Sequence, residues 1–225
     1  MTPLVAGAQY WDEKFAKTMT HHSRQNTKIS RDFLSNIKEP LFFSDKNRLF
    51  RQVIFASENT LDFGCGTGEL SFLLATYNGK KYKGVDFSPK AINFATARYA
   101  SKNIEFRAGN LLDGTLKLDE HFDLCVTSNV LEHFADPWSV CDRLFLLADR
   151  LIVLVPYKQP VTDGYEFEGG AGHVFCFDER RFRERYAVSA YFVFKTSGWR
   201  YSSLGERPRQ LAVLLENKAN ARETQ

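Results

Sequence analysis

The sequence predicts an α/β fold: a doubly wound sheet of seven mostly parallel strands, with an antiparallel C-terminal hairpin and a helical N-terminal cap. Two observations predict this fold. Between residues 59 and 155, short β-type runs alternate with amphipathic helical stretches, which is typical of βα units covering both faces of a parallel sheet. Between residues 188 and 216, two β-type runs are separated only by a turn-rich stretch, which predicts antiparallel pairing at a sheet edge.

Each element has its own local signal. Residues 10–56 carry apolar residues at helical spacing, so we expect residues 1–56 to form a helical cap on the domain at residues 57–225. Further helices are expected to end near Asn78-Gly79, to begin at Pro89 after Ser88, and to cover about 136–148. The predicted strands are 60–63, 82–86, 104–107, 122–127, 151–155, 188–195 and 210–216.

Composition limits the class of protein. With 225 residues, 44% hydrophobic and 25% charged, the chain is neither disordered nor fibrous and suffices for one α/β domain. It lacks an apolar run of the roughly 20 residues that a membrane span needs, and residues 1–10 do not resemble a secretory signal, so a cytoplasmic protein is expected. A formal charge of +3 is too small to indicate a nucleic-acid partner. Four widely separated cysteines form no C-x-x-C pair.

The most informative segment is LDFGCGTGEL at residues 61–70, in which a strand passes through three glycines into a helix. Gly64 permits a tight turn, Gly66 lets the backbone approach a ligand, and Gly68 lets the helix approach the strand. Asp86 ends the next strand, where its carboxylate can accept hydrogen bonds from both hydroxyls of a ribose. The segment therefore predicts a nucleotide-type site, although glycines also serve turns of purely structural purpose.

The glycine spacing indicates which kind of nucleotide binds. The fingerprint for dinucleotides is G-x-G-x-x-G, whereas this chain has G-x-G-x-G, so the turn is not arranged for a pyrophosphate. A ligand with ribose and adenine but without phosphates fits this spacing. Phe87 either packs on the adenine face or turns toward the core.

Five blocks of the chain occur in the order of a known family: LDFGCGTGEL, VDFSPKAINFA, FRAGNLLDG, FDLCVTSNVLEHFADP and LIVLVPY. Over residues 58–175 the chain resembles the class I S-adenosylmethionine-dependent methyltransferases, which have a Rossmann-like fold. The resemblance implies S-adenosyl-L-methionine as cofactor, with Asp62 at its amino group and Asp86 at its ribose. The other implied cofactor contacts are Gly64, Cys65 and Gly66 at the methionine part, Phe87, Asn110 and Leu111 at adenine, and Ser128 and Asn129 beside the sulfonium. Asn110 stands where many members have an aspartate.

Two histidines are candidate catalytic residues. His133, just past the fourth strand, is placed to take a proton from a hydroxyl, although a Glu-His pair here can also serve packing alone. His173 follows a glycine-rich loop where substrate contact is expected; alternatively it anchors Val174-Phe175 through a loop carbonyl. No metal site is predicted, because the spacing of His133, His173 and Glu168 does not demand one.

The N-terminal helices are expected to close over the cofactor. Tyr10 and Trp11 would exclude water there, and Arg24 would suit the cofactor carboxylate; an ordinary helical cap is the alternative. We expect a methyltransferase (EC 2.1.1) acting on a small molecule or carbohydrate, at an oxygen. The alternatives are methylation of a nitrogen on a small molecule or macromolecule, and a non-catalytic cofactor-binding partner or sensor. The glycine spacing and the C-terminal hairpin argue against a nicotinamide-dependent oxidoreductase.

Overall fold

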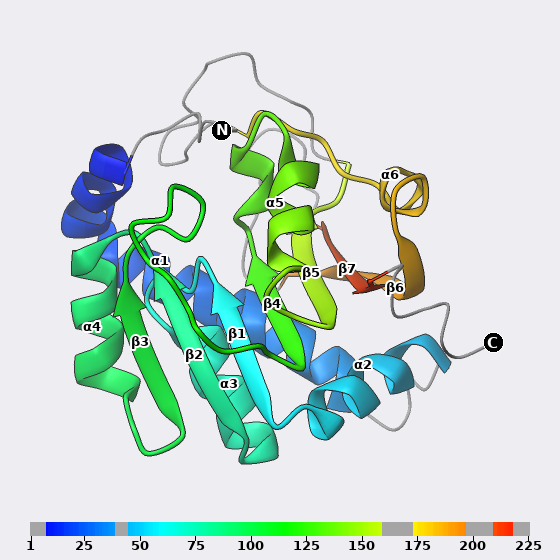
Figure 1. The fold of residues 1–225 in the computed structure, drawn as a ribbon, viewed down its shortest axis with the longest axis horizontal. Coiled ribbons are helices and arrows are strands. Elements are labelled where there is room, and N and C mark those ends of the chain that lie inside the picture. Colours follow the sequence, from blue (N-terminus) through cyan, green and yellow to red (C-terminus); the bar gives the residue numbers. More distant parts are fainter. Residues whose placement is uncertain (1–7, 39–44, 159–172, 197–208, 218–225) are drawn as a thin grey trace.

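The computed structural model describes residues 8–38, 45–158, 173–196 and 209–217, and within these ranges it contains one seven-stranded sheet (Figure 1). The strands are β1 (Asn59–Phe63), β2 (Lys81–Asp86), β3 (Ile104–Ala108), β4 (Leu124–Ser128), β5 (Arg150–Pro156), β6 (Ala187–Lys195) and β7 (Arg209–Glu216). Their order across the sheet is β3-β2-β1-β4-β5-β7-β6. The chain runs outward from β1 to β3 and then resumes on the other side of β1 with β4. In α/β sheets, ligands bind in the crevice at the carboxyl ends of the strands, at the point where the strand order reverses in this way.

The C-terminal hairpin confirms the predicted edge pairing. Strands β1 to β5 pair in parallel, whereas β7 pairs antiparallel with β5 on one side and with β6 on the other. The β6–β7 register is irregular between Val188 and Ala190. Because β7 lies between two strands, six of its residues, from Gln210 to Leu215, are buried.

The helices form two layers. One layer packs on one face of the sheet and contains α1 (Ala8–Lys38), α2 (Asp45–Ala56), α3 (Glu69–Asn78) and α4 (Pro89–Tyr99). The other face is covered by the short 3-10 helix η2 (Leu131–His133), α5 (Pro137–Leu144) and α6 (Glu179–Arg183). Figure 1 shows α5 in front of the sheet and α1 and α3 behind it. None of the described helices is both long enough and apolar enough to cross a membrane.

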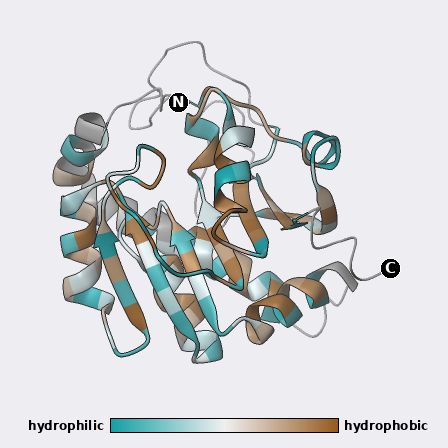
Figure 2. Ribbon diagram, in the orientation of Figure 1, coloured by the Kyte–Doolittle hydropathy of each residue, from teal (hydrophilic) through white to brown (hydrophobic). Residues whose placement is uncertain are grey.

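Strand β5 shows how the two layers are joined. Its sequence, RLIVLVP, is a continuous apolar run after the first residue, and all of that run is buried. Ile152 and Leu154 pack into the cluster with α1 to α4, whereas Leu151, Val153 and Val155 pack into the cluster with α5. In Figure 2 the hydrophobic colour follows this strand. Such a strand belongs at the centre of a sheet that is covered on both faces.

The predicted boundaries of α3 and α4 are confirmed. Helix α3 ends at Gly79, whose φ of 73° lies in the left-handed region that favours glycine at a helix end. Helix α4 begins at Pro89, and the Ser88 hydroxyl accepts a hydrogen bond from the Ala91 N–H (3.2 Å).

The predicted boundaries around α5 were wrong by a few residues. Asp136 caps the helix as expected, but the helix ends at Leu144 rather than near residue 148. The reason is that residues 145–147 form a turn and Ala148 pairs with Phe122 in an isolated parallel bridge. For the same reason β4 starts at Leu124, because Phe122 belongs to this bridge instead of to the strand.

Candidate functional site

The glycine turn, residues 64–68, joins β1 to α3 at the carboxyl edge of the sheet. Gly64, Gly66 and Gly68 all have left-handed φ angles, of 71°, 52° and 84°. A Cβ on Gly64 would lie 2.4 Å from a Val130 methyl carbon, and one on Gly68 would meet Phe106 and Ala95 within 3 Å. At Gly64 and Gly68, glycine therefore adopts a left-handed backbone conformation and also permits a close packing contact. A residue with a Cβ would be unfavourable on both counts.

The N–H groups of this turn are largely bonded within the protein. Those of Gly64 and Cys65 donate to the Val85 carbonyl (2.8 and 3.1 Å), that of Gly66 to Asp86 Oδ2 (2.9 Å) and that of Gly68 to the Cys65 carbonyl (2.9 Å). The turn is thus held rigid by its own bonds and does not present a row of donors to a pyrophosphate.

Asp86 ties the end of β2 to the glycine turn. One carboxylate oxygen accepts from the Gly66 N–H and the other accepts from the Ser88 N–H, both at 2.9 Å. The side chain is nearly buried, and this burial raises the pKa of Asp86 to about 6. Each carboxylate oxygen has a second lone pair, so the carboxylate can still accept hydrogen bonds from a ligand.

Asp62 lies beside the turn and faces the first turn of α3. Its Oδ2 atom accepts hydrogen bonds from the Ser71 N–H (3.1 Å) and the Ser71 hydroxyl (2.6 Å). Burial is the main cause that raises the pKa of Asp62 to about 7, and the nearby Asp86 carboxylate adds to it. Asp62 and Asp86 are thus two buried carboxyl groups on either side of the same turn.

The remaining predicted cofactor residues lie at the carboxyl ends of β1 to β4 or in the loops that follow them, and most are half-buried: Cys65, Phe87, Asn110, Leu111, Ser128 and Asn129. The Asn110 Oδ1 atom accepts from the Leu112 N–H (2.9 Å), which shapes the loop after β3. Asn129 has a left-handed φ of 53°, and its side-chain amide donates to the Ser128 hydroxyl (3.1 Å). This conformation turns the chain sharply from β4 into η2.

Three side chains past β4 and β5 form what we call the histidine cluster: Glu132, His133 and His173. The His133 and His173 rings meet edge to face, with centroids 5.1 Å apart. His173 Nε2 lies 3.9 Å from Glu132 Oε1. Glu132 and His133 are buried, and His173 is half-buried. The structure therefore brings the two predicted catalytic histidines together, whereas Glu168 lies outside the described residues.

Helix α1 begins over this edge of the sheet. Trp11 packs edge-on against His133 with ring centroids 4.8 Å apart. One residue later, Asp12 accepts from the Ser88 hydroxyl (2.7 Å) and pairs with the Lys90 ammonium (3.1 Å). The first turn of α1 thus bridges the segment after β2 and the segment after β4.

The other predicted lid residues lie differently. Tyr10 is part of α1, but its side chain lies outside the described residues. Arg24 is exposed, and 13 helical residues place it about 20 Å along the helix axis from Trp11. Sequence reasoning missed Asp12, because no local pattern connects it to Ser88, 76 residues away. Sequence reasoning identified Glu132 only as half of a Glu-His pair. It did not predict that Glu132 is buried beside a second histidine, His173.

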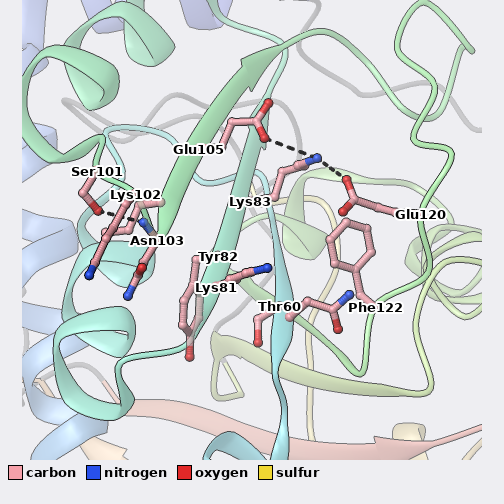
Figure 3. A pocket seen from close by; sticks show the side chains of 12 residues that line it. Thr60, Lys81, Tyr82, Lys83, Ser101, Lys102, Asn103, Glu105, Glu120 and Phe122 are labelled. Atoms are coloured by element: carbon pink, nitrogen blue, oxygen red, sulfur yellow. Dashed lines mark hydrogen bonds and ion pairs between the residues drawn. The ribbon is translucent and has the colours of Figure 1, made fainter.

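A hollow at the opposite, amino edge of the sheet does not contain these residues (Figure 3). It is lined by the first residues of β1, β2 and β3 and by neighbouring loops. The Lys83 ammonium there pairs with Glu105 (3.4 Å) and with Glu120, so its charge is already compensated. The amino and carboxyl edges of the sheet lie five residues apart along β2, which is a distance of about 16 Å.

Known proteins resemble the chain in sequence and in fold. Residues 54–155 match a family model described as a methyltransferase domain. The chain is similar to a malonyl-[acyl-carrier protein] O-methyltransferase of Acetivibrio thermocellus (25% identity over 118 residues, 52% of this chain and 38% of that protein). It is also similar to a ribosomal protein L11 methyltransferase of Dictyoglomus turgidum (34% over 76 residues, 33% of this chain and 24% of that protein). The chain thus matches less than two fifths of the length of these relatives.

The structural likeness extends further along the chain. A SAM-dependent methyltransferase of Anabaena variabilis superimposes with a TM-score of 0.62 at 12% identity, covering 97% of this chain and 98% of that chain. The five sequence blocks that carry the resemblance lie within residues 58–175. The family model matches residues 58–155 of this segment, and so covers most of it. Residues 54–155 thus match a methyltransferase domain, and the sheet order and the structural likeness show the fold of the class I S-adenosylmethionine-dependent methyltransferases.

Proposed function

We propose that the protein transfers the methyl group of S-adenosylmethionine to a hydroxyl of a small molecule or carbohydrate. The observation that carries this proposal is the buried His133 imidazole, which follows Ser128 and Asn129 at the end of β4 and lies beneath Trp11. A hydroxyl is a weak nucleophile unless a base removes its proton, and imidazole has a suitable pKa. An oxygen acceptor needs a base in this position to remove its proton, whereas an uncharged amine can attack through its lone pair without one.

In this proposal, Asp86 accepts hydrogen bonds from the ribose hydroxyls and the glycine turn lies against the methionine part. Asp62 supports the cofactor amino group, while Phe87 and Leu111 flank adenine and Asn110 accepts from the adenine amino group. The bound cofactor supplies an electrophilic methyl group on a sulfonium. The protein aligns the acceptor with that methyl group and excludes water, and Trp11 contributes to both by closing the pocket over His133.

The curated relatives support methyl transfer but differ in their acceptors. The name of one relative states O-methylation of malonyl-[acyl-carrier protein], and that of the other states methylation of a ribosomal protein. The preference for an oxygen on a small molecule or carbohydrate therefore rests on the histidines of this chain. The mild charge of +3 gives no support for a nucleic-acid acceptor.

The test is turnover with a panel of sugars, phenols and amines, measured as S-adenosylhomocysteine (SAH) formed and as methylated product by mass spectrometry. We expect O-methylated products in this panel. Methylation of amines alone would contradict the oxygen assignment. Cofactor binding without turnover across the whole panel would instead favour a cofactor-binding partner or sensor.

A further inference from the structure

The histidine cluster has the donor set of a metal site. One ligand atom from each of Glu132, His133 and His173 can be chosen so that all three lie within 4.8 Å of one another. Two imidazole nitrogens and one carboxylate oxygen are donors that suit Zn²⁺, Fe²⁺ or Co²⁺, whereas Mg²⁺ and Ca²⁺ favour oxygen donors alone. We propose that these three residues bind one divalent metal ion, either Zn²⁺ or an ion with similar ligand preferences such as Fe²⁺ or Co²⁺.

The backbone holds the three donors together. The Val174 and Phe175 N–H groups both donate to the Glu132 carbonyl, at 2.9 and 3.3 Å. These two bonds fix the segment after β5 against η2, although the two segments are about 40 residues apart in the chain. Because His173 immediately precedes the first of these donors, its position beside Glu132 is set by the fold.

The Glu132 carboxyl group itself points to a missing ligand. Its side chain is 1% exposed, and neither carboxylate oxygen has a hydrogen-bond partner among the described residues. A buried polar group without a partner costs free energy, and such groups are rare in native proteins. A cation between Glu132 and the two imidazoles would supply the partner that the carboxylate lacks.

The geometry needs only a small adjustment. At Zn–ligand bonds of about 2.1 Å, the donors of a tetrahedral site lie about 3.4 Å apart. The donor atoms must therefore approach by up to about 1.4 Å, and rotation of the His173 side chain, which is 24% exposed, can supply part of this movement. Three protein ligands also leave one coordination position open, as in catalytic zinc sites.

The ion has a chemical consequence that rests on the proposed function. An acceptor hydroxyl bound at the open position would have its pKa lowered, as a zinc-bound water has. The O–H bond would break and the proton would pass to solvent. The acceptor oxygen would then attack the methyl carbon, so that a C–O bond forms, the C–S bond breaks and S-adenosylhomocysteine leaves. With an ion bound, His133 serves as a ligand, and the ion takes over the activation that a free imidazole would otherwise provide.

The experiment measures ion binding by the full-length chain without acceptor or cofactor. The protein is stripped with a chelator and titrated separately with Zn²⁺, in competition with a chromophoric chelator, and with Co²⁺, followed by its visible absorption. We expect one ion per chain. Glu132→Gln and His173→Ala should each weaken binding by at least about tenfold. The matched control is His121→Ala, which removes an exposed histidine paired with Asp149 (3.0 Å) and should leave ion affinity unchanged.

The outcomes separate this site from the methyltransferase proposal. SAH titration of each variant shows whether the fold is intact. A chain that binds SAH but takes up neither ion overturns the metal site and leaves methyl transfer standing. Ion binding that survives both Glu132→Gln and His173→Ala, or that is lost only in His121→Ala, also overturns it. Ion binding by a chain that fails to bind SAH supports the metal site and contradicts the proposed function.

Discussion

The glycine turn and the histidine cluster lie at the same edge of the sheet but are built in opposite ways. At the glycine turn, the buried Asp62 and Asp86 carboxylates accept hydrogen bonds from neighbouring N–H and hydroxyl groups. In the histidine cluster, the Glu132 carboxylate is equally buried but has no such bond within the described residues. The carboxylates at the turn therefore have hydrogen-bond partners within the protein, whereas the Glu132 carboxylate would gain a partner from the proposed ion.

The largest expected effect concerns the histidine cluster. His133→Ala should lower the turnover number by about 10²- to 10⁴-fold, because we propose that His133 activates the acceptor hydroxyl, either as a base or as a ligand of the activating ion. The SAH affinity, measured by calorimetry, should stay within a few-fold of wild type because the glycine turn is untouched. Equal losses of turnover and SAH affinity would contradict the division between the two regions.

The next effect tests the packing of the glycine turn. Gly64→Ala combines an unfavourable left-handed φ with a Cβ 2.4 Å from Val130, so it should lower the free energy of unfolding by about 2–5 kcal/mol. Gly79→Ala is a matched control, because its φ of 73° is similar but nothing lies within 4 Å of the added Cβ. It should cost only about 1–2 kcal/mol. Equal losses in urea denaturation would show that close packing at Gly64 contributes nothing.

A pH dependence of cofactor binding follows from the two buried carboxyl groups. Burial raises the pKa of Asp86 to about 6 and that of Asp62 to about 7. Because only the ionised Asp86 accepts freely from both ribose hydroxyls, protonation opposes binding, and SAH affinity should fall as pH drops through this range. We expect at least about tenfold weaker binding at pH 5 than at pH 8. Asp86→Asn and Asp62→Asn should each flatten part of the profile, whereas an unchanged profile in both would contradict the account.

The smallest effect concerns the bridge made by α1. Asp12→Ala removes the contacts with Ser88 and Lys90, and SAH should then dissociate about twofold to fivefold faster because α1 covers the pocket less firmly. Stopped-flow release rates measure this change. Arg31→Ala alters an exposed position on the same helix and serves as the control. The same acceleration in both variants would mean that the Asp12 contacts do not hold α1 in place.

Much of the fold could be predicted because its signals are local. Glycines at residues 64–68 mark the turn, Ser88-Pro89 marks a helix start, and the apolar run of β5 marks a central strand. The end of α5 was misplaced because the apolar residues after Leu144 continue a helical pattern while the backbone already turns toward the bridge at Ala148.

The candidate site could be predicted only in part, for the same physical reason. Asp62 and Asp86 follow from strand ends near one motif, so their positions beside the glycine turn could be inferred. The approach of His173 to Glu132 depends on backbone bonds between distant segments, and the bridge from Asp12 to Ser88 depends on how α1 packs. Such contacts arise from tertiary packing and leave no periodic trace in the sequence.

A calorimetric titration of SAH into wild type and Asp86→Ala tests whether this carboxylate holds the cofactor. Wild type should bind SAH, and the variant should bind it at least about a hundredfold more weakly, because hydrogen bonds to a buried carboxylate are lost. Glu120→Ala, at the opposite edge of the sheet, should bind like wild type. Unchanged SAH affinity in a folded Asp86→Ala variant would contradict the claim that this carboxylate and the glycine turn hold the cofactor.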